Sequence, residues 1–167
     1  MGRMRRFFTN VFGSWFVLRR RFPPALLDEI AAVIAQGERT HRGEVCVAIE
    51  SRLAPLAVLG GLDVAIRAHE VFSQLRVWDT EHNNGVLFYV SLAEHRIEIV
   101  ADRGIAARVT SAEWDAICAR MRECFAAGQW RAGSLEGIAA AHALLRQHFP
   151  ADDDASRGEL SDRPVLL

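Results

Sequence analysis

The sequence predicts an α/β fold, an α/β/α sandwich in which helices flank a small mixed sheet in the order α-β-α-β-β-α-α. Two short apolar runs rich in β-branched and aromatic residues, 44–50 and 86–91, have the composition of buried strands. A third run, 96–102, alternates apolar and polar residues as a half-exposed strand does, and a polar turn joins it to the second run. Segments with apolar residues at helical spacing lie before, between and after these strands.

The composition is that of one globular domain. Of the 167 residues, 50% are hydrophobic and 25% charged, and the formal net charge of −1 gives no general attraction to nucleic acid. We divide the chain into a basic aromatic arm (1–21), a central domain (22–150) and a C-terminal tail (151–167).

The first half of the domain contains a crossover. Pro23 and Pro24 begin the first helix, which is predicted to run to about Thr40. After the first strand, Gly60 and Gly61 form a turn before the second helix, which we expect to end near Trp78. The first strand, this helix and the second strand then form a right-handed parallel unit, and the third strand returns antiparallel as a hairpin.

The second half is helical. Thr110 and Glu113 have the spacing of a capping box, so a helix begins there, and Gly128 ends it. Ser134 is expected to cap the last helix, which Pro150 ends. Residues 151–167 are predicted to form a tail, loose or laid along the surface.

The arm contains six Arg and no acidic residue. Its apolar stretch is too short to span a bilayer, and closes with Arg rather than with a signal-peptide cleavage site. As one helix it would place Phe8, Val11, Phe12, Trp15 and Phe16 on one face. The arm residues that we select as candidates for membrane or partner contact are Arg5, Arg6, Phe8, Phe12, Trp15, Phe16, Arg19 and Arg20. Binding to a membrane surface and packing on the domain or on a partner both remain open.

Polar residues are expected to meet at one edge of the sheet, where the first two strands begin and the third ends. They are Glu44, Trp78, Asp79, Glu81, Asn83, Asn84, Gly85, Asp102 and Arg103. Such an edge could hold a hard cation or a phosphate, or could simply be a solvated set of loops. No nucleophile-elbow, Walker-type, dinucleotide-binding or zinc-protease motif is present, and His142 is expected in the core. The lack of a signal peptide and the three cysteines, an odd number without metal spacing, favour a cytoplasmic location.

The segment 77–87 (VWDTEHNNGVL), followed by the hairpin and 102–105 (DRGI), resembles the TPM-domain family. The resemblance extends from about residue 26 to 149, and the two ends are similar to a soluble proteobacterial subgroup. The family includes thylakoid-lumen acid phosphatase-like proteins, photosystem II repair factors and a nematode receptor modulator. It implies the same sandwich fold.

The resemblance implies two kinds of function. Some members bind calcium or magnesium, and weak phosphatase activity is ascribed to plant members. Metal ligands here would then be Asp79, Glu81 and Asp102. However, Asn83 and Gln129 stand where many relatives carry Asp, which removes two charges that a divalent cation favours.

Other relatives act as accessory factors for membrane proteins, and the subgroup is often encoded near LemA-type proteins or membrane-anchored TPM relatives. We therefore expect a non-enzymatic accessory module that associates with membrane proteins, cytoplasmic or peripheral at the inner membrane. The alternative is a cation-binding domain with weak, acid phosphatase-like phosphomonoesterase activity.

Overall fold

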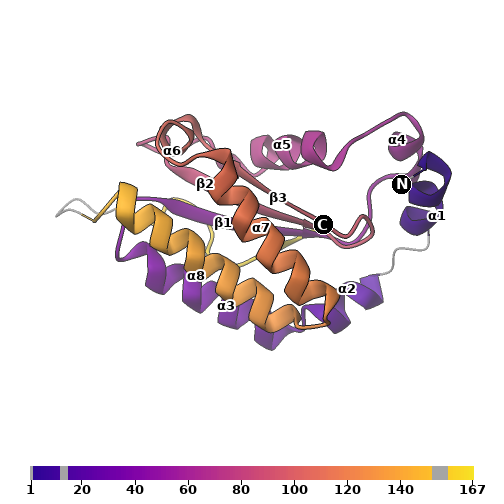
Figure 1. The fold of residues 1–167 in the computed structure, drawn as a ribbon, viewed down its shortest axis with the longest axis horizontal. Coiled ribbons are helices and arrows are strands. Elements are labelled where there is room, and N and C mark those ends of the chain that lie inside the picture. Colours follow the sequence, from indigo (N-terminus) through magenta and orange to yellow (C-terminus); the bar gives the residue numbers. More distant parts are fainter. Residues whose placement is uncertain (1, 12–14, 152–157) are drawn as a thin grey trace.

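The computed structural model describes residues 2–11, 15–151 and 158–167 (Figure 1). Its elements are α1 (Arg3–Val11), α2 (Trp15–Arg21), α3 (Pro24–Glu38), β1 (Glu44–Glu50), α4 (Pro55–Leu59), α5 (Val64–Gln74), β2 (Gly85–Ser91), β3 (Arg96–Ala101), α6 (Arg103–Ala106), α7 (Ser111–Ala126), α8 (Trp130–His148) and β4 (Val165–Leu166).

The sheet has the order β3-β2-β1-β4. Strands β1 and β2 are parallel, and β2 pairs antiparallel with β3, which confirms the crossover and the hairpin. Helices α3, α7 and α8 cover one face of the sheet and α5 lies on the other (Figure 1). The predicted sandwich with a mixed sheet is therefore confirmed.

Strand β1 is buried along its length and apolar between its terminal glutamates because it contributes to two cores. Val45, Val47 and Ile49 point into the larger core, with α3, α7 and α8. Cys46 and Ala48 point into the smaller core, with α5. A strand covered on both faces does not show the alternation of a half-exposed one.

The N-terminal arm forms two helices rather than the single helix that was expected. Helix α1 ends at Val11 and α2 begins at Trp15, while Phe12 lies outside the described residues. The arm ends inside the larger core, where Leu18 and Phe22 are buried. The C-terminal end of the arm is therefore held to the domain by core packing.

The predicted tail is in part a strand. Val165 and Leu166 pair in parallel with Ala48 and Ile49 of β1. Without this pairing the outer edge of the fully buried strand β1 would carry unpaired N–H and C=O groups, which are costly when covered by apolar side chains. Strand β4 was not predicted, because two residues carry no recognisable strand pattern of their own.

Several helix boundaries also differ from those predicted. Helix α8 begins at Trp130, so Ser134 lies within it and its hydroxyl donates to the Trp130 carbonyl at 2.8 Å. Helix α5 ends at Gln74, before Trp78, and α3 ends at Glu38. Helices α4 and α6 were not predicted. The capping box of α7 is confirmed, with both reciprocal hydrogen bonds present.

Candidate functional site

The register of the sheet brings part of the predicted polar edge together. Glu44 at the start of β1 pairs with Gly85 at the start of β2. Across β2, the Asp102 N–H donates to the Gly85 carbonyl at 2.8 Å. Glu44, Gly85 and Asp102 therefore lie in one row across three strands. Gly85 is required there, since a Cβ would lie 2.0 Å from the Val77 carbonyl oxygen.

The two asparagines fix the loop that precedes β2. Asn83 adopts φ 52°, and its side-chain oxygen accepts from Arg103 Nε at 2.8 Å. Asn84 is buried; its N–H donates to the Thr80 hydroxyl at 3.0 Å, and its amide nitrogen donates to the Arg42 carbonyl. Both asparagines therefore stabilise the conformation of this loop, a role for which the amide side chain is well suited.

Two buried oxygen atoms at this edge have no hydrogen-bond partner within the described ranges: Asn84 Oδ1 and Asp102 Oδ2. The other carboxylate oxygen of Asp102 accepts from the Arg103 N–H at 2.7 Å and caps α6. Buried acceptors that lack a donor indicate a place where a water molecule or a small ligand is held.

The residues expected to bind a cation are engaged differently. Asp79 forms an exposed ion pair with Arg76 at 2.5 Å. Glu81 is exposed, as is Trp78. Across residues 2–11, 15–151 and 158–167, no three His, Cys, Asp or Glu side chains are grouped so that they could hold a metal ion. Asp79, Glu81 and Asp102 are therefore not gathered into one ligand group among these residues.

Gln129, the second position at which this chain lacks a family carboxylate, lies elsewhere. Gln129 lies in the turn between the end of α7 and the start of α8. The last residues of the polar edge, Asp102 and Arg103, lie at the start of α6, before α7 begins. Helix α7 has 16 residues, a length of about 24 Å. The two departures from the family pattern therefore do not concern one site.

The C-terminal segment, residues 158–167, covers the polar edge. The Leu160 N–H donates to Glu44 Oε2 at 3.3 Å, and the Glu81 N–H donates to the Glu159 carboxylate at 3.1 Å. Further along, Asp162 hydrogen-bonds the buried carboxyl of Glu38. Burial, reinforced by the nearby charges of Glu44 and Asp162, raises the pKa of Glu38 to about 8. This pKa favours the protonated form of Glu38 at neutral pH.

A second buried titratable pair joins α3, the β1 entry loop and α8. His41 Nδ1 accepts from the Gly43 N–H at 3.1 Å, so its Nε2 carries the proton and donates to His142 Nδ1 at 2.7 Å. Burial lowers the pKa of each imidazole to about 4. Neutral His142 is thus a buried core residue, as predicted.

The inner side of the arm is fixed by a buried asparagine that sequence reasoning missed. Asn10 is 0% exposed; its amide donates to Glu94 Oε1 at 2.5 Å and to the Arg6 carbonyl at 2.8 Å. Its oxygen accepts from the Leu53 N–H at 2.6 Å. Arg6 adds an ion pair with Glu94 at 2.7 Å and donates to the Leu62 carbonyl at 2.8 Å. Arg6, expected to face a membrane or partner, therefore faces the domain.

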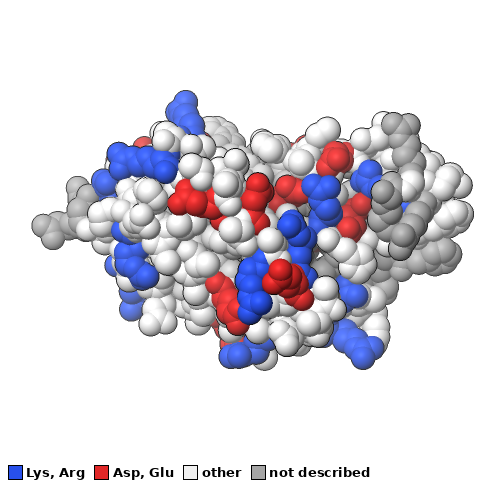
Figure 2. Space-filling model, viewed as in Figure 1, with Lys and Arg blue, Asp and Glu red and all other residues white. Residues whose placement is uncertain are grey.

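The outer side of the arm, by contrast, leaves large apolar side chains in solvent. Phe8 is 52% exposed and Phe16 74%, and Leu56 on the neighbouring helix α4 is 80% exposed. We define the arm surface as Met4, Phe8, Val11, Trp15, Phe16, Leu56 and Leu59. Figure 2 shows acidic and basic side chains interspersed across the middle of this face of the molecule.

Two of the predicted cations accompany this arm surface. Arg19 and Arg20 are exposed, and the Arg19 guanidinium lies 5.2 Å from the centre of the Trp15 ring. The side chain of Arg5 and all of Phe12 lie outside the described part. No helix within the described residues is long and apolar enough to cross a bilayer.

Comparison with known proteins confirms the predicted resemblance. The BA42 protein of the psychrophilic bacterium Bizionia argentinensis superposes with a TM-score of 0.75 and 28% identity, over 86% of this chain and 93% of BA42. The N-terminal domain of a P. gingivalis protein gives a TM-score of 0.61 over 75% of this chain and 77% of that one; at 19% identity this shows the fold alone. No curated protein matches the sequence.

The family model of the TPM domain matches residues 21–144, which include β1, β2, β3 and the polar edge. The arm before residue 21 and the C-terminal segment lie outside this match. Because the match spans well over half of the sequence, this chain belongs to the TPM domain family.

Proposed function

We propose that this chain is a non-catalytic accessory module that attaches at a membrane surface through its N-terminal arm and acts there on membrane proteins. The observation that carries the proposal is the two-sided arm. Asn10 and Arg6 fix its inner side to the domain, while the arm surface stays exposed beside Arg19 and Arg20.

Exposed aromatic side chains are costly to keep in water unless something covers them. Transferring one such side chain into an apolar environment is favourable by about 1.5–3 kcal/mol. Exposed apolar side chains beside Arg19 and Arg20 have the composition of the face that amphipathic helices insert at anionic interfaces. Each Arg near an anionic surface adds about 1 kcal/mol of attraction.

The partners that fit this position are membrane proteins, such as LemA-type proteins or membrane-anchored TPM relatives, at the cytoplasmic face of the inner membrane. The domain behind the arm would then be presented to them in a fixed orientation, because the arm is hydrogen-bonded to the hairpin turn and to the loop before α4. A rigid connection suits a module that positions a second surface relative to the membrane.

Vesicle flotation of the full chain tests the attachment. Deleting residues 1–21 would be a poor test, since Leu18 belongs to the core. We expect binding to vesicles that contain anionic lipid, and at least about tenfold weaker binding for Phe16→Ser or Leu56→Ser. Ile66→Ser is the matched control, because Ile66 on α5 is 55% exposed but lies outside the arm.

Equal loss of binding in the Ile66→Ser control, or equal binding of all variants, would contradict attachment through the arm. Salt should weaken the wild-type interaction, since exposed charges are screened over about 8–10 Å at physiological ionic strength. Insensitivity to both salt and anionic lipid would leave no role for Arg19 and Arg20.

Cation binding at the polar edge, with weak phosphatase activity, is a second candidate. It is favoured by one observation, the unpartnered oxygen atoms of Asn84 and Asp102. Titration with calcium and magnesium, followed by backbone amide shifts, tests it. Saturable shifts confined to residues 79–85 and 102–104 that Asp102→Asn abolishes would support it, and unchanged spectra at millimolar metal would exclude it.

A further inference from the structure

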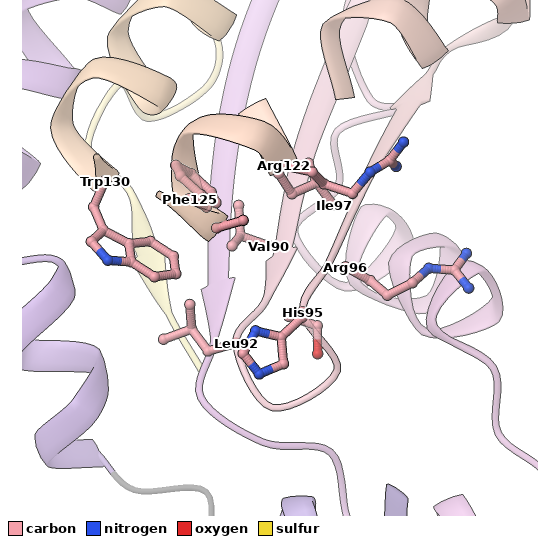
Figure 3. Close-up of a pocket in the computed structure, with 10 residues that line it drawn as sticks. Val90, Leu92, His95, Arg96, Ile97, Arg122, Phe125 and Trp130 are labelled. Carbon is pink, nitrogen blue, oxygen red and sulfur yellow. The ribbon is translucent and has the colours of Figure 1, made fainter. Parts of the chain in front are cut away.

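An apolar pocket that neither proposed function uses opens between the β2–β3 hairpin and the turn joining α7 to α8 (Figure 3). Its volume is about 210 Å³. Its apolar lining is Val90, Leu92, Ile97, Phe125, Ala126 and Trp130. A cavity of about 150 Å³ is enough to bind benzene when its walls are apolar. This pocket therefore has room for a larger aliphatic or aromatic group.

The walls of the pocket are held in place before any ligand arrives. The Trp130 ring stacks on Phe125 with centroids 4.6 Å apart, and the Arg21 guanidinium lies 4.4 Å from the centre of the Trp130 ring. On the opposite side, the hairpin turn is fixed through Glu94, which is bound by Asn10 of the arm. Preformed walls reduce the ordering cost of binding.

The rim of the pocket is cationic. Arg96 is already paired with Glu98 through a 3.1 Å hydrogen bond. Arg122 is exposed and forms no ion pair with any residue in the described ranges. In Figure 3 its side chain lies beside Ile97 and its guanidinium extends outward, away from Trp130. A ligand with its apolar part inside would thus meet an uncompensated positive charge at the mouth.

We propose that this pocket binds the aliphatic chain of a fatty carboxylate, with the carboxylate at the mouth near Arg122. The apolar lining matches the chain, and charge complementarity favours the anionic end over a neutral one. The pocket lies apart from the polar edge, and its ligand is a single amphiphile rather than the membrane surface proposed for the arm. The two proposals can therefore fail independently.

The first test is titration of the full chain with decanoate, followed by methyl NMR shifts. We expect saturable shifts of Val90, Leu92 and Ile97 below the concentration at which decanoate forms micelles. Ala126→Phe places a larger side chain at the exposed end of α7, where Ala126 lines the pocket, and should weaken binding at least about tenfold. Circular dichroism and the unchanged methyl spectrum of α3 would show that this variant is folded.

The second test separates the apolar part of the recognition from the ionic part. Arg122→Gln should weaken decanoate binding about threefold to fivefold and leave decanol binding unchanged, as expected for a partly solvated ion pair. Arg39→Gln is the charge-matched control, since Arg39 is exposed after α3, at the other end of the sheet. Phe16→Ser, which tests the arm, should bind decanoate normally.

Three results would overturn the proposal: no saturable shifts at the pocket methyl groups, shifts spread over the surface, or decanol bound as tightly as decanoate. Unweakened binding in a folded Ala126→Phe variant would also overturn it, because the ligand would then lie elsewhere. Failure of decanoate binding together with normal vesicle flotation would leave the proposed function intact.

Discussion

Replacing Glu38 by Gln removes a buried ionisable group that contacts both β1 and the C-terminal segment. Glu38 is 8% exposed, and its Oε1 accepts from the Val45 N–H at 2.7 Å. The carboxyl of Glu38 also hydrogen-bonds Asp162. Glutamine preserves both interactions, because its oxygen accepts from Val45 and its amide group donates to Asp162, but it cannot ionise.

The magnitude follows from the pKa of Glu38, about 8 in the folded chain against an ordinary value of 4.5. Between these values the folded state binds more protons than the unfolded state, so the free energy of unfolding falls as the pH rises from about 4.5 to 8. The full effect is at most about 5 kcal/mol. The Gln variant lacks this loss and should exceed the wild type by about 2–5 kcal/mol at pH 9.

His41 and His142 act in the opposite direction. Their pKa of about 4 lies below the ordinary 6.5, so the unfolded state binds more protons in that interval. Their contribution is present above pH 6.5 and is lost as the pH falls toward 4. The wild type should therefore be most stable near pH 6, and the Gln variant should hold its maximum stability into the alkaline range.

Urea unfolding at a series of pH values from 4 to 9, followed by tryptophan fluorescence, measures both curves. Glu136→Gln is the control. Glu136 lies exposed on α8, where it pairs with Arg120 of α7, so its replacement should leave the pH profile unchanged. The reasoning is refuted if the wild type gains stability between pH 6.5 and 8, where only Glu38 changes its protonation. It is equally refuted if Glu38→Gln loses stability there in parallel with the wild type.

Two further changes test the packing that the structure describes. Asn10→Leu leaves the Leu53 N–H without its acceptor and should cost about 2–4 kcal/mol; hydrogen exchange should become faster across α1, and unchanged protection would contradict the anchoring role. Gly85→Ala would bring a methyl group against the Val77 carbonyl and should lower the free energy of unfolding by about 1–3 kcal/mol or more. Thermal unfolding measures this loss, and an unchanged midpoint would mean that the loop before β2 moves aside without cost.

The parts of the fold that could be predicted are those that local patterns encode. The two apolar strands, the hairpin and the capped helix α7 each carry a pattern within a dozen residues. Strand β4 could not be predicted, since it exists only through pairing with β1. The start of α8 was misplaced because Ser134 was taken as its N-cap, whereas Ser134 lies inside the helix and Gly133 beside it lets the helix approach Phe125 closely.

The part of the polar edge that could be predicted is the row of Glu44, Gly85 and Asp102, because strand order and direction determine which strand ends meet. The interaction partners of the other edge residues could not be predicted, since an ion pair such as Arg76–Asp79 depends on where α5 ends. The contacts that anchor the arm to the domain could not be predicted either. Asn10 and Glu94 are 84 positions apart, and nothing in either local sequence indicates the other.

The late position of β4 in the chain has a consequence for synthesis. A ribosome delivers β1 and its neighbours well before residues 158–167, so the free side of β1 stays open while the rest of the domain can already form. An open, apolar strand edge is a template for pairing with another copy. The two residues shortly before β4 that bond to the polar edge, Glu159 to the Glu81 N–H and Leu160 to the Glu44 carboxylate, would then guide the closing strand to β1 before a neighbouring nascent chain pairs there.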